Sequence, residues 1–185
     1  MADNLPDEIV SEILSPALKV PEAMFSDMSP KSPFAAYSRV SSSAALLVCK
    51  TWLHVATPLL YSVVVMRSKA QARALYASLT GTPELSRFIK KLRAEGGFGP
   101  LMHQILKCTP NVSDLFLSLQ LHCSESSDGL ALGIFLINPT RLIIFDDSDN
   151  LLKNKAVLQL IYVLEKAVTK WTILVCISPW VWLAH

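Results

Sequence analysis

The sequence has little charge for its length. Charged side chains make up 17% of its 185 residues, against roughly 25% in an ordinary globular domain. Hydrophobic residues make up 51%, which is more apolar surface than one domain of this size needs. Because large exposed apolar patches mark interaction sites, we expect part of this surface to bind another protein.

Runs of basic residues are also missing. The longest is the pair Lys90–Lys91, and the net charge is only +2. Proteins that bind nucleic acid through its phosphates gather lysine and arginine on one face. The sequence therefore predicts no nucleic-acid partner.

Signals for export and for membrane insertion are lacking as well. The N-terminus has no basic segment followed by an apolar one, as a secretory signal would. The apolar segment 171–184 is interrupted by Pro179 and is shorter than the roughly 20 residues that cross a bilayer.

The four cysteines are far apart, which is typical of reduced thiols: Cys49, Cys108, Cys123 and Cys176. We expect a protein of the cytoplasm or nucleus with no membrane span.

No catalytic motif is present. The Gly-x-Ser-x-Gly turn of serine hydrolases is absent. The glycine-rich stretch 96–99 lacks the Lys-Ser/Thr that completes a phosphate-binding loop, so a flexible turn is the expectation there. We predict a protein without enzyme activity and without a cofactor.

Metal-binding patterns are incomplete. Two sets of candidate ligands occur: His103, Cys108, His122 and Cys123, and then Asp146, Asp147, Asp149 and Asn150. The first set lacks the Cys-x-x-Cys spacing of structural zinc sites. The second lacks the glycine and the distant glutamate of a calcium loop. No metal site is expected from either.

The N-terminal segment predicts an apolar helix. Pro6 suits a first helical turn, where its missing N–H would have no partner. The apolar residues recur at i, i+4 in two rows, Ile9 with Ile13 and Val10 with Leu14. Together these rows give a wide apolar face. Pro16 and Pro21 are expected to end the helix.

A second helical segment follows a spacer. Residues 20–43 are rich in proline and serine, which is loop composition with room for one turn at 22–25. Serines 41–43 can cap a helix over 44–48. Apolar residues then recur at helical spacing to Leu60, with a bend or an end expected at Pro58. The β-branched run 61–66 predicts a strand.

The rest of the chain alternates between strands and helices. Strands are predicted at 89–93, 113–117, 140–145 and 171–175, and helices at 71–79, 101–108, 130–136 and 155–168. The strands carry leucines at intervals of 23, 27 and 32 residues: Leu92, Leu115, Leu142 and Leu174. This spacing is close to the 20–29 residues of leucine-rich repeats. The same alternation also fits a generic parallel α/β sheet.

The N-terminal residues carry a family resemblance. Leu5-Pro6-Asp7-Glu8-Ile9, the pair Ile13-Leu14, and Val48-Cys49-Lys50-Thr51-Trp52 resemble the F-box. Downstream, the strand at 61–65 and the segment 82–85 resemble fungal F-box proteins with degenerate leucine-rich repeats. The sequence departs from the family in the long insertion between the two halves.

The resemblance implies a fold, a partner and a site. The fold is mixed α/β: a three-helix F-box over residues 1–66, with the proline- and serine-rich insertion at 20–43, then a partial leucine-rich-repeat-like solenoid over 67–185. We expect the solenoid to be truncated, because its apolar C-terminus lacks the polar cap of a repeat array. The resemblance further implies that the helices bind the Skp adaptor through Leu5, Pro6, Ile9, Ile13, Leu46, Val48 and Trp52. The alternative is that several of these residues, Trp52 above all, belong to the internal core, since buried aromatic side chains serve both roles.

The function implied is that of a substrate receptor. In a Skp–cullin–F-box ubiquitin ligase, such a subunit holds a protein substrate and has no catalytic residues of its own. The alternative is a scaffold protein that keeps the fold without assembling a ligase. A small α/β enzyme is a third interpretation, which the missing motifs argue against. The sequence does not identify the substrate.

Overall fold

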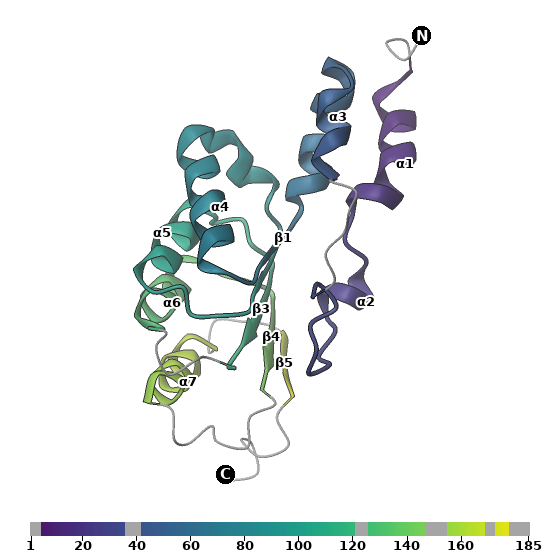
Figure 1. Cartoon of the computed structure of the whole chain (residues 1–185). Coiled ribbons are helices and arrows are strands. Elements are labelled where there is room, and N and C mark those ends of the chain that lie inside the picture. Colours follow the sequence, from purple (N-terminus) through teal and green to yellow (C-terminus); the bar gives the residue numbers. More distant parts are fainter. Residues whose placement is uncertain (1–4, 36–41, 121–125, 147–154, 169–172, 178–185) are drawn as a thin grey trace. The chain divides into compact units, whose positions relative to one another are not determined.

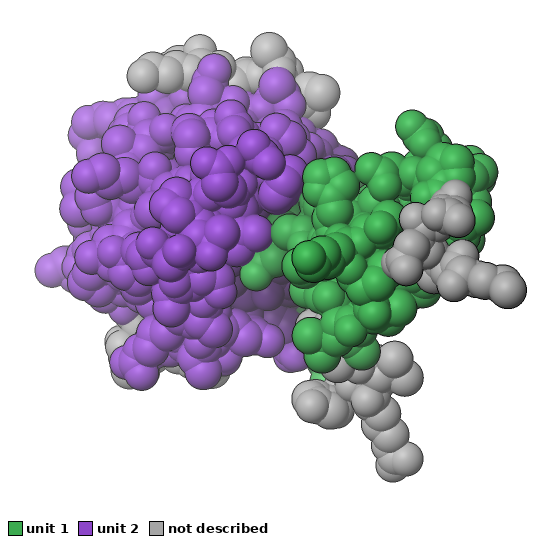
Figure 2. Space-filling view, turned by 90° about the horizontal axis from the view of Figure 1, so that it is seen from above, with its two compact units in different colours: residues 1–63 green, residues 64–185 purple. Residues whose placement is uncertain are grey.

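The computed structural model describes residues 5–35, 42–120, 126–146, 155–168 and 173–177. The chain divides into two compact units, residues 1–63 and 64–185 (Figure 2). The division falls at the start of a strand, slightly before the boundary after residue 66 that the sequence suggested. Each unit has its own elements and its own packing.

The first unit is helical. It consists of α1 (Asp7–Leu18), α2 (Glu22–Phe25), the 3-10 helix η2 (Ser42–Leu47) and α3 (Lys50–Tyr61). Helix α1 begins where the sequence predicts, since the backbone N–H groups of Ile9 and Val10 donate to the Pro6 carbonyl at 3.0 and 3.1 Å. Asp7 and Glu8 lie in its first turn, where their charge favours the positive end of the helix dipole.

The sequence predicted that Pro16 and Pro21 end α1; the helix does end before Pro21, but Pro16 lies inside it. The helix continues to Leu18, and the Lys19 N–H donates to the Ser15 carbonyl at 2.9 Å. A proline inside a helix costs about 3 kcal/mol, but Leu18 is buried at 6% exposure and burying a leucine contributes roughly 1.5–3 kcal/mol. The burial of Leu18 therefore offsets a large part of the cost of the proline.

Pro58 likewise lies inside a helix. The sequence predicted a bend or an end of the helix at Pro58, and α3 runs through Pro58 to Tyr61, so the helix does not end there. Tyr61 belongs to this helix, and the strand predicted from residue 61 begins only at Val63. The predicted helix at 44–48 is a 3-10 helix that ends at Leu47, and the extended backbone of Cys49 separates it from α3.

The second unit is a sheet with helices. Its strands lie in the order of the sequence: β1 (Val63–Met66), β2 (Lys91–Ala94), β3 (Asp114–Ser118), β4 (Arg141–Phe145) and β5 (Ile173–Ile177). Strands β2 to β5 are parallel. The architecture is therefore mixed α/β, and the strands predicted at 89–93, 113–117, 140–145 and 171–175 are confirmed with shifted ends.

Helices connect the strands. They are α4 (Lys69–Gly81), the 3-10 helix η3 (Pro83–Phe88), α5 (Pro100–Cys108), α6 (Asp128–Gly133) continued by the 3-10 helix η4 (Ile134–Leu136), and α7 (Lys155–Val168). In Figure 1, α4 to α7 lie along one face of the sheet. No helix in the described ranges has both the length and the apolar character needed to cross a membrane.

The repeat leucines are neighbours in the sheet. Leu92 pairs in register with Leu115, Leu115 with Leu142, and Leu142 with Leu174. The first three are fully buried. Hydrogen bonds also join the starts of β2, β3 and β4, because the Ser113 N–H donates to the Lys90 carbonyl at 2.8 Å and the Arg141 N–H to the Ser113 carbonyl at 3.0 Å.

A buried arginine follows Leu92 in β2 and therefore lies on the opposite face of the sheet from it. Arg93 is 2% exposed, and its guanidinium carbon lies 3.8 Å from the centre of the Phe116 ring. Its Nε donates to Glu95 Oε1 at 2.6 Å, while Arg67 Nε donates to the other oxygen at 3.1 Å. Because a buried charge is costly unless it is paired, the ion pair with Glu95 helps to stabilise Arg93 in this buried position.

Two glycines of the second unit, Gly129 and Gly81, differ in the space available for a side chain. A Cβ on Gly129 in α6 would come within 2.8 Å of the Gly99 carbonyl carbon. A Cβ on Gly81 at the end of α4 would meet nothing within 4 Å. We expect Gly129→Ala to lower the free energy of unfolding by at least about 2 kcal/mol, because backbone must move. Gly81→Ala should be neutral or slightly stabilising.

Urea unfolding of the two variants and the parent chain measures both effects. Equal midpoints for Gly129→Ala and Gly81→Ala would contradict the close approach of α6 to the loop before α5.

Candidate docking surface

Helix α1 has two apolar faces with different surroundings. On one face, Val10, Leu14 and Leu18 are buried at 1%, 4% and 6% exposure. They form a core with Val55 and Ala56 of α3. This spacing of four residues places all three on one side of the helix, so a single face of α1 accounts for its packing in the first unit.

The neighbouring row is exposed. Leu5 precedes the helix, and Ile9 and Ile13 follow at intervals of four; their exposed fractions are 42%, 43% and 53%. We call these three residues the α1 stripe. A helix that packs against one neighbour needs only one apolar face. The α1 stripe is therefore apolar surface that the described packing of the first unit does not use.

More apolar surface lies around the junction of η2 and α3. Leu47, Val48 and Leu53 are exposed at 86%, 56% and 47%. The Cys49 backbone is extended, with φ −162° and ψ 173°, and it turns the chain into α3. The start of α1 lies beside α3, since Asp7 Oδ2 of α1 is 3.8 Å from His54 Nε2 of α3.

Two of the predicted docking residues pack against the core of the first unit. Leu46 and Trp52 are half-buried and pack against the core of Val10, Leu14, Leu18, Val55 and Ala56. The indole nitrogen of Trp52 is buried and has no hydrogen-bond partner among the described residues. Their placement fits a structural role in holding η2 and α3 together.

Of the seven predicted docking residues, five are exposed: Leu5, Pro6, Ile9, Ile13 and Val48. The structure adds Leu47 and Leu53, which were not predicted as docking residues. Helical spacing from the buried pair Val55 and Ala56 would have placed Leu53 on a different side of α3. No sequence signal separates Leu46 from Leu47, because the geometry of a 3-10 helix decides which one points inward.

The alternative sites gain no support from the described part of the chain. It contains no group of three or more histidine, cysteine, aspartate or glutamate side chains that could hold a metal. His103 and Cys108 are half-buried, while His122 and Cys123 lie outside the described residues. Asp146 is buried at 4% exposure, and residues 147–154 are not described.

Adjacent residues of α1 provide a matched test of the two faces. Leu14→Ala removes a buried side chain and should lower the free energy of unfolding by about 2–5 kcal/mol. Ile13→Ala removes a side chain that is 53% exposed and should cost less than about 1 kcal/mol. Thermal unfolding followed by circular dichroism measures both. A larger loss for Ile13→Ala than for Leu14→Ala would contradict the assignment of the faces.

Comparison with known proteins adds no relative to this chain. No family model, no curated protein and no solved structure matches it.

Proposed function

We propose that this chain is a substrate-receptor subunit of a Skp–cullin–F-box ubiquitin ligase. In this proposal residues 5–61 form an F-box that binds the Skp adaptor. The strand–helix unit presents a protein substrate. The chain contributes no catalytic group, and its role is to hold the substrate close to the charged ubiquitin-conjugating enzyme.

The observation that carries the proposal is the α1 stripe. Leu5, Ile9 and Ile13 belong to the segment that resembles the first half of an F-box, and each is more than two-fifths exposed. Exposed apolar side chains on a helix whose other face is already packed are what a helical adaptor would cover. Val48, at the start of the second half of the motif, is exposed as well.

The second unit supports the substrate-receptor part of the proposal. Consecutive parallel strands lie side by side in the order of the sequence, and the helices follow one face (Figure 1). A doubly wound enzyme sheet instead reverses its strand order, and its ligand binds at that reversal. The order of β1 to β5 has no such reversal, and it favours a leucine-rich-repeat-like solenoid that binds protein.

One observation favours the alternative of a scaffold without ligase assembly. Leu46 and Trp52 pack against the core of the first unit, so two of the seven proposed adaptor contacts have a structural explanation. An F-box-like helical module could keep these residues for stability alone. Adaptor binding separates the two functions. Either function is compatible with the expected location in the cytoplasm or nucleus.

The decisive experiment is binding of the full chain to the purified Skp adaptor. The double variant Ile9→Ala/Ile13→Ala removes most of the α1 stripe without touching the buried row. We expect its affinity for the adaptor to fall by at least about 100-fold, since interface anchors commonly contribute 2 kcal/mol or more each. Isothermal titration calorimetry measures the loss.

Glu12→Ala serves as the matched control. Glu12 lies on the same helix and is exposed, but it is not part of the α1 stripe. Its affinity should stay within about threefold of the parent chain, because rim charges contribute little. Unchanged adaptor binding by the double variant, with circular dichroism showing intact helices, would reject the proposal. No binding by the parent chain would favour the scaffold.

A further inference from the structure

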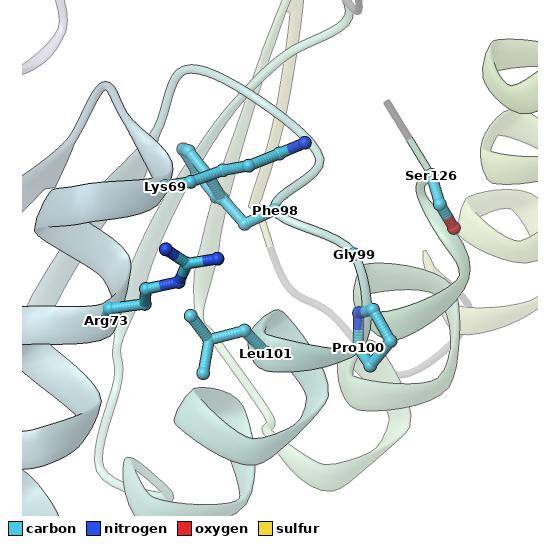
Figure 3. A pocket seen from close by; sticks show the side chains of 7 residues that line it. All are labelled: Lys69, Arg73, Phe98, Gly99, Pro100, Leu101 and Ser126. Atoms are coloured by element: carbon cyan, nitrogen blue, oxygen red, sulfur yellow. The ribbon is translucent and has the colours of Figure 1, made fainter. Parts of the chain in front are cut away.

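A pocket in the second unit combines two cations with apolar walls. Its volume is about 350 Å³, and its lining comes from three places in the sequence: Lys69 and Arg73 of α4, the stretch from Phe98 to Leu101, and Ser126. Figure 3 shows the two basic side chains reaching from α4 toward the glycine-rich loop and the start of α5. This loop is the stretch that the sequence predicted to be a flexible turn.

The charge on the lining side chains is all positive. Neither Lys69 nor Arg73 forms an ion pair or a side-chain hydrogen bond within the described part of the chain. They stand at i, i+4 on one helix, a spacing at which like charges destabilise the helix. The Ser126 hydroxyl donates to the Asp128 carboxylate at 2.7 Å, and no acidic side chain lines the pocket among the described residues.

The wall opposite the cations is fixed by close backbone packing. The Gly99 N–H donates to the Ser126 carbonyl at 3.1 Å, and a Cβ on Gly97 would lie 2.6 Å from that same oxygen. Gly99 has a φ of +59°, which side chains rarely tolerate. The loop therefore packs closely against the backbone of Ser126.

The apolar part of the pocket comes from Phe98, Pro100 and Leu101. Phe98 is buried at 4% exposure, so its ring is packed into the second unit where it lines the pocket. A volume of about 350 Å³ is at the lower end of the roughly 300–1,000 Å³ of small-molecule sites. The pocket thus offers charge for an anionic group and an apolar surface for a small organic group.

We propose that this pocket binds a small phosphorylated molecule, with Lys69 and Arg73 on the phosphate and Phe98 and Leu101 against its organic part. Arginine and lysine are the side chains that bind phosphate most often, through charge-assisted hydrogen bonds. All lining residues belong to the second unit. The site is therefore independent of the α1 stripe and of adaptor binding.

Titration of the full chain with phenyl phosphate tests the proposal, with inorganic phosphate and benzyl alcohol as partial ligands. Phenyl phosphate should bind more tightly than either, because it alone supplies both the charge and the ring. The variant Lys69→Gln/Arg73→Gln should weaken its binding by at least about tenfold. Lys107→Gln, which removes an exposed charge at the end of α5, should bind like the parent chain.

Three results would overturn the proposal. The first is no binding of phenyl phosphate at millimolar concentration. The second is equal weakening by Lys69→Gln/Arg73→Gln and by Lys107→Gln, which would indicate only a general effect of net charge. The third is binding of a phosphoserine peptide without binding of either small phosphate. Adaptor affinity, measured on the same variants, should be unchanged.

Discussion

Parallel pairing in the order of the sequence is the constraint on which the second unit depends. A parallel strand can join its neighbour only after the chain has returned over a crossover. In this protein a helix makes each return, and the new strand adds beside the previous one. Leu92, Leu115, Leu142 and Leu174 occupy matching positions in the four parallel strands. Helix packing follows from this pairing, and so does the close approach of Gly129 to the loop before α5.

The sequence predicted this arrangement well where periodicity was strong. The apolar pattern predicted 155–168, and α7 spans Lys155–Val168; the repeat leucines identified positions that the structure places in register. Prediction failed at prolines, because a local rule cannot include the burial of Leu18 or the continuation of α3 through Pro58. At the loop 96–99 the sequence did not predict the contact with Ser126, because that residue comes from a distant part of the chain.

The sequence predicted that the N-terminal helices carry exposed apolar residues, but it did not predict which individual residues are exposed. Helical spacing alone divides α1 into the row of Val10 and Leu14 and the row of Ile9 and Ile13, but it does not say which row is buried. That choice depends on where α3 lies. For Leu46 and Trp52 the motif indicated docking, whereas the structure packs both against the core. The pocket beside α4 had no sequence signal, since its residues are spread from Lys69 to Ser126.

The two faces of α1 also bear on how this protein changes over time. Replacement of Leu14 acts directly on the stability of the helical unit, so folding itself preserves an apolar residue there. Nothing in the described packing does the same for Leu5, Ile9 or Ile13. Mutation should replace these three with polar residues freely, unless another molecule selects against it. If the proposed adaptor does bind the α1 stripe, that binding would be the pressure that keeps these three positions apolar.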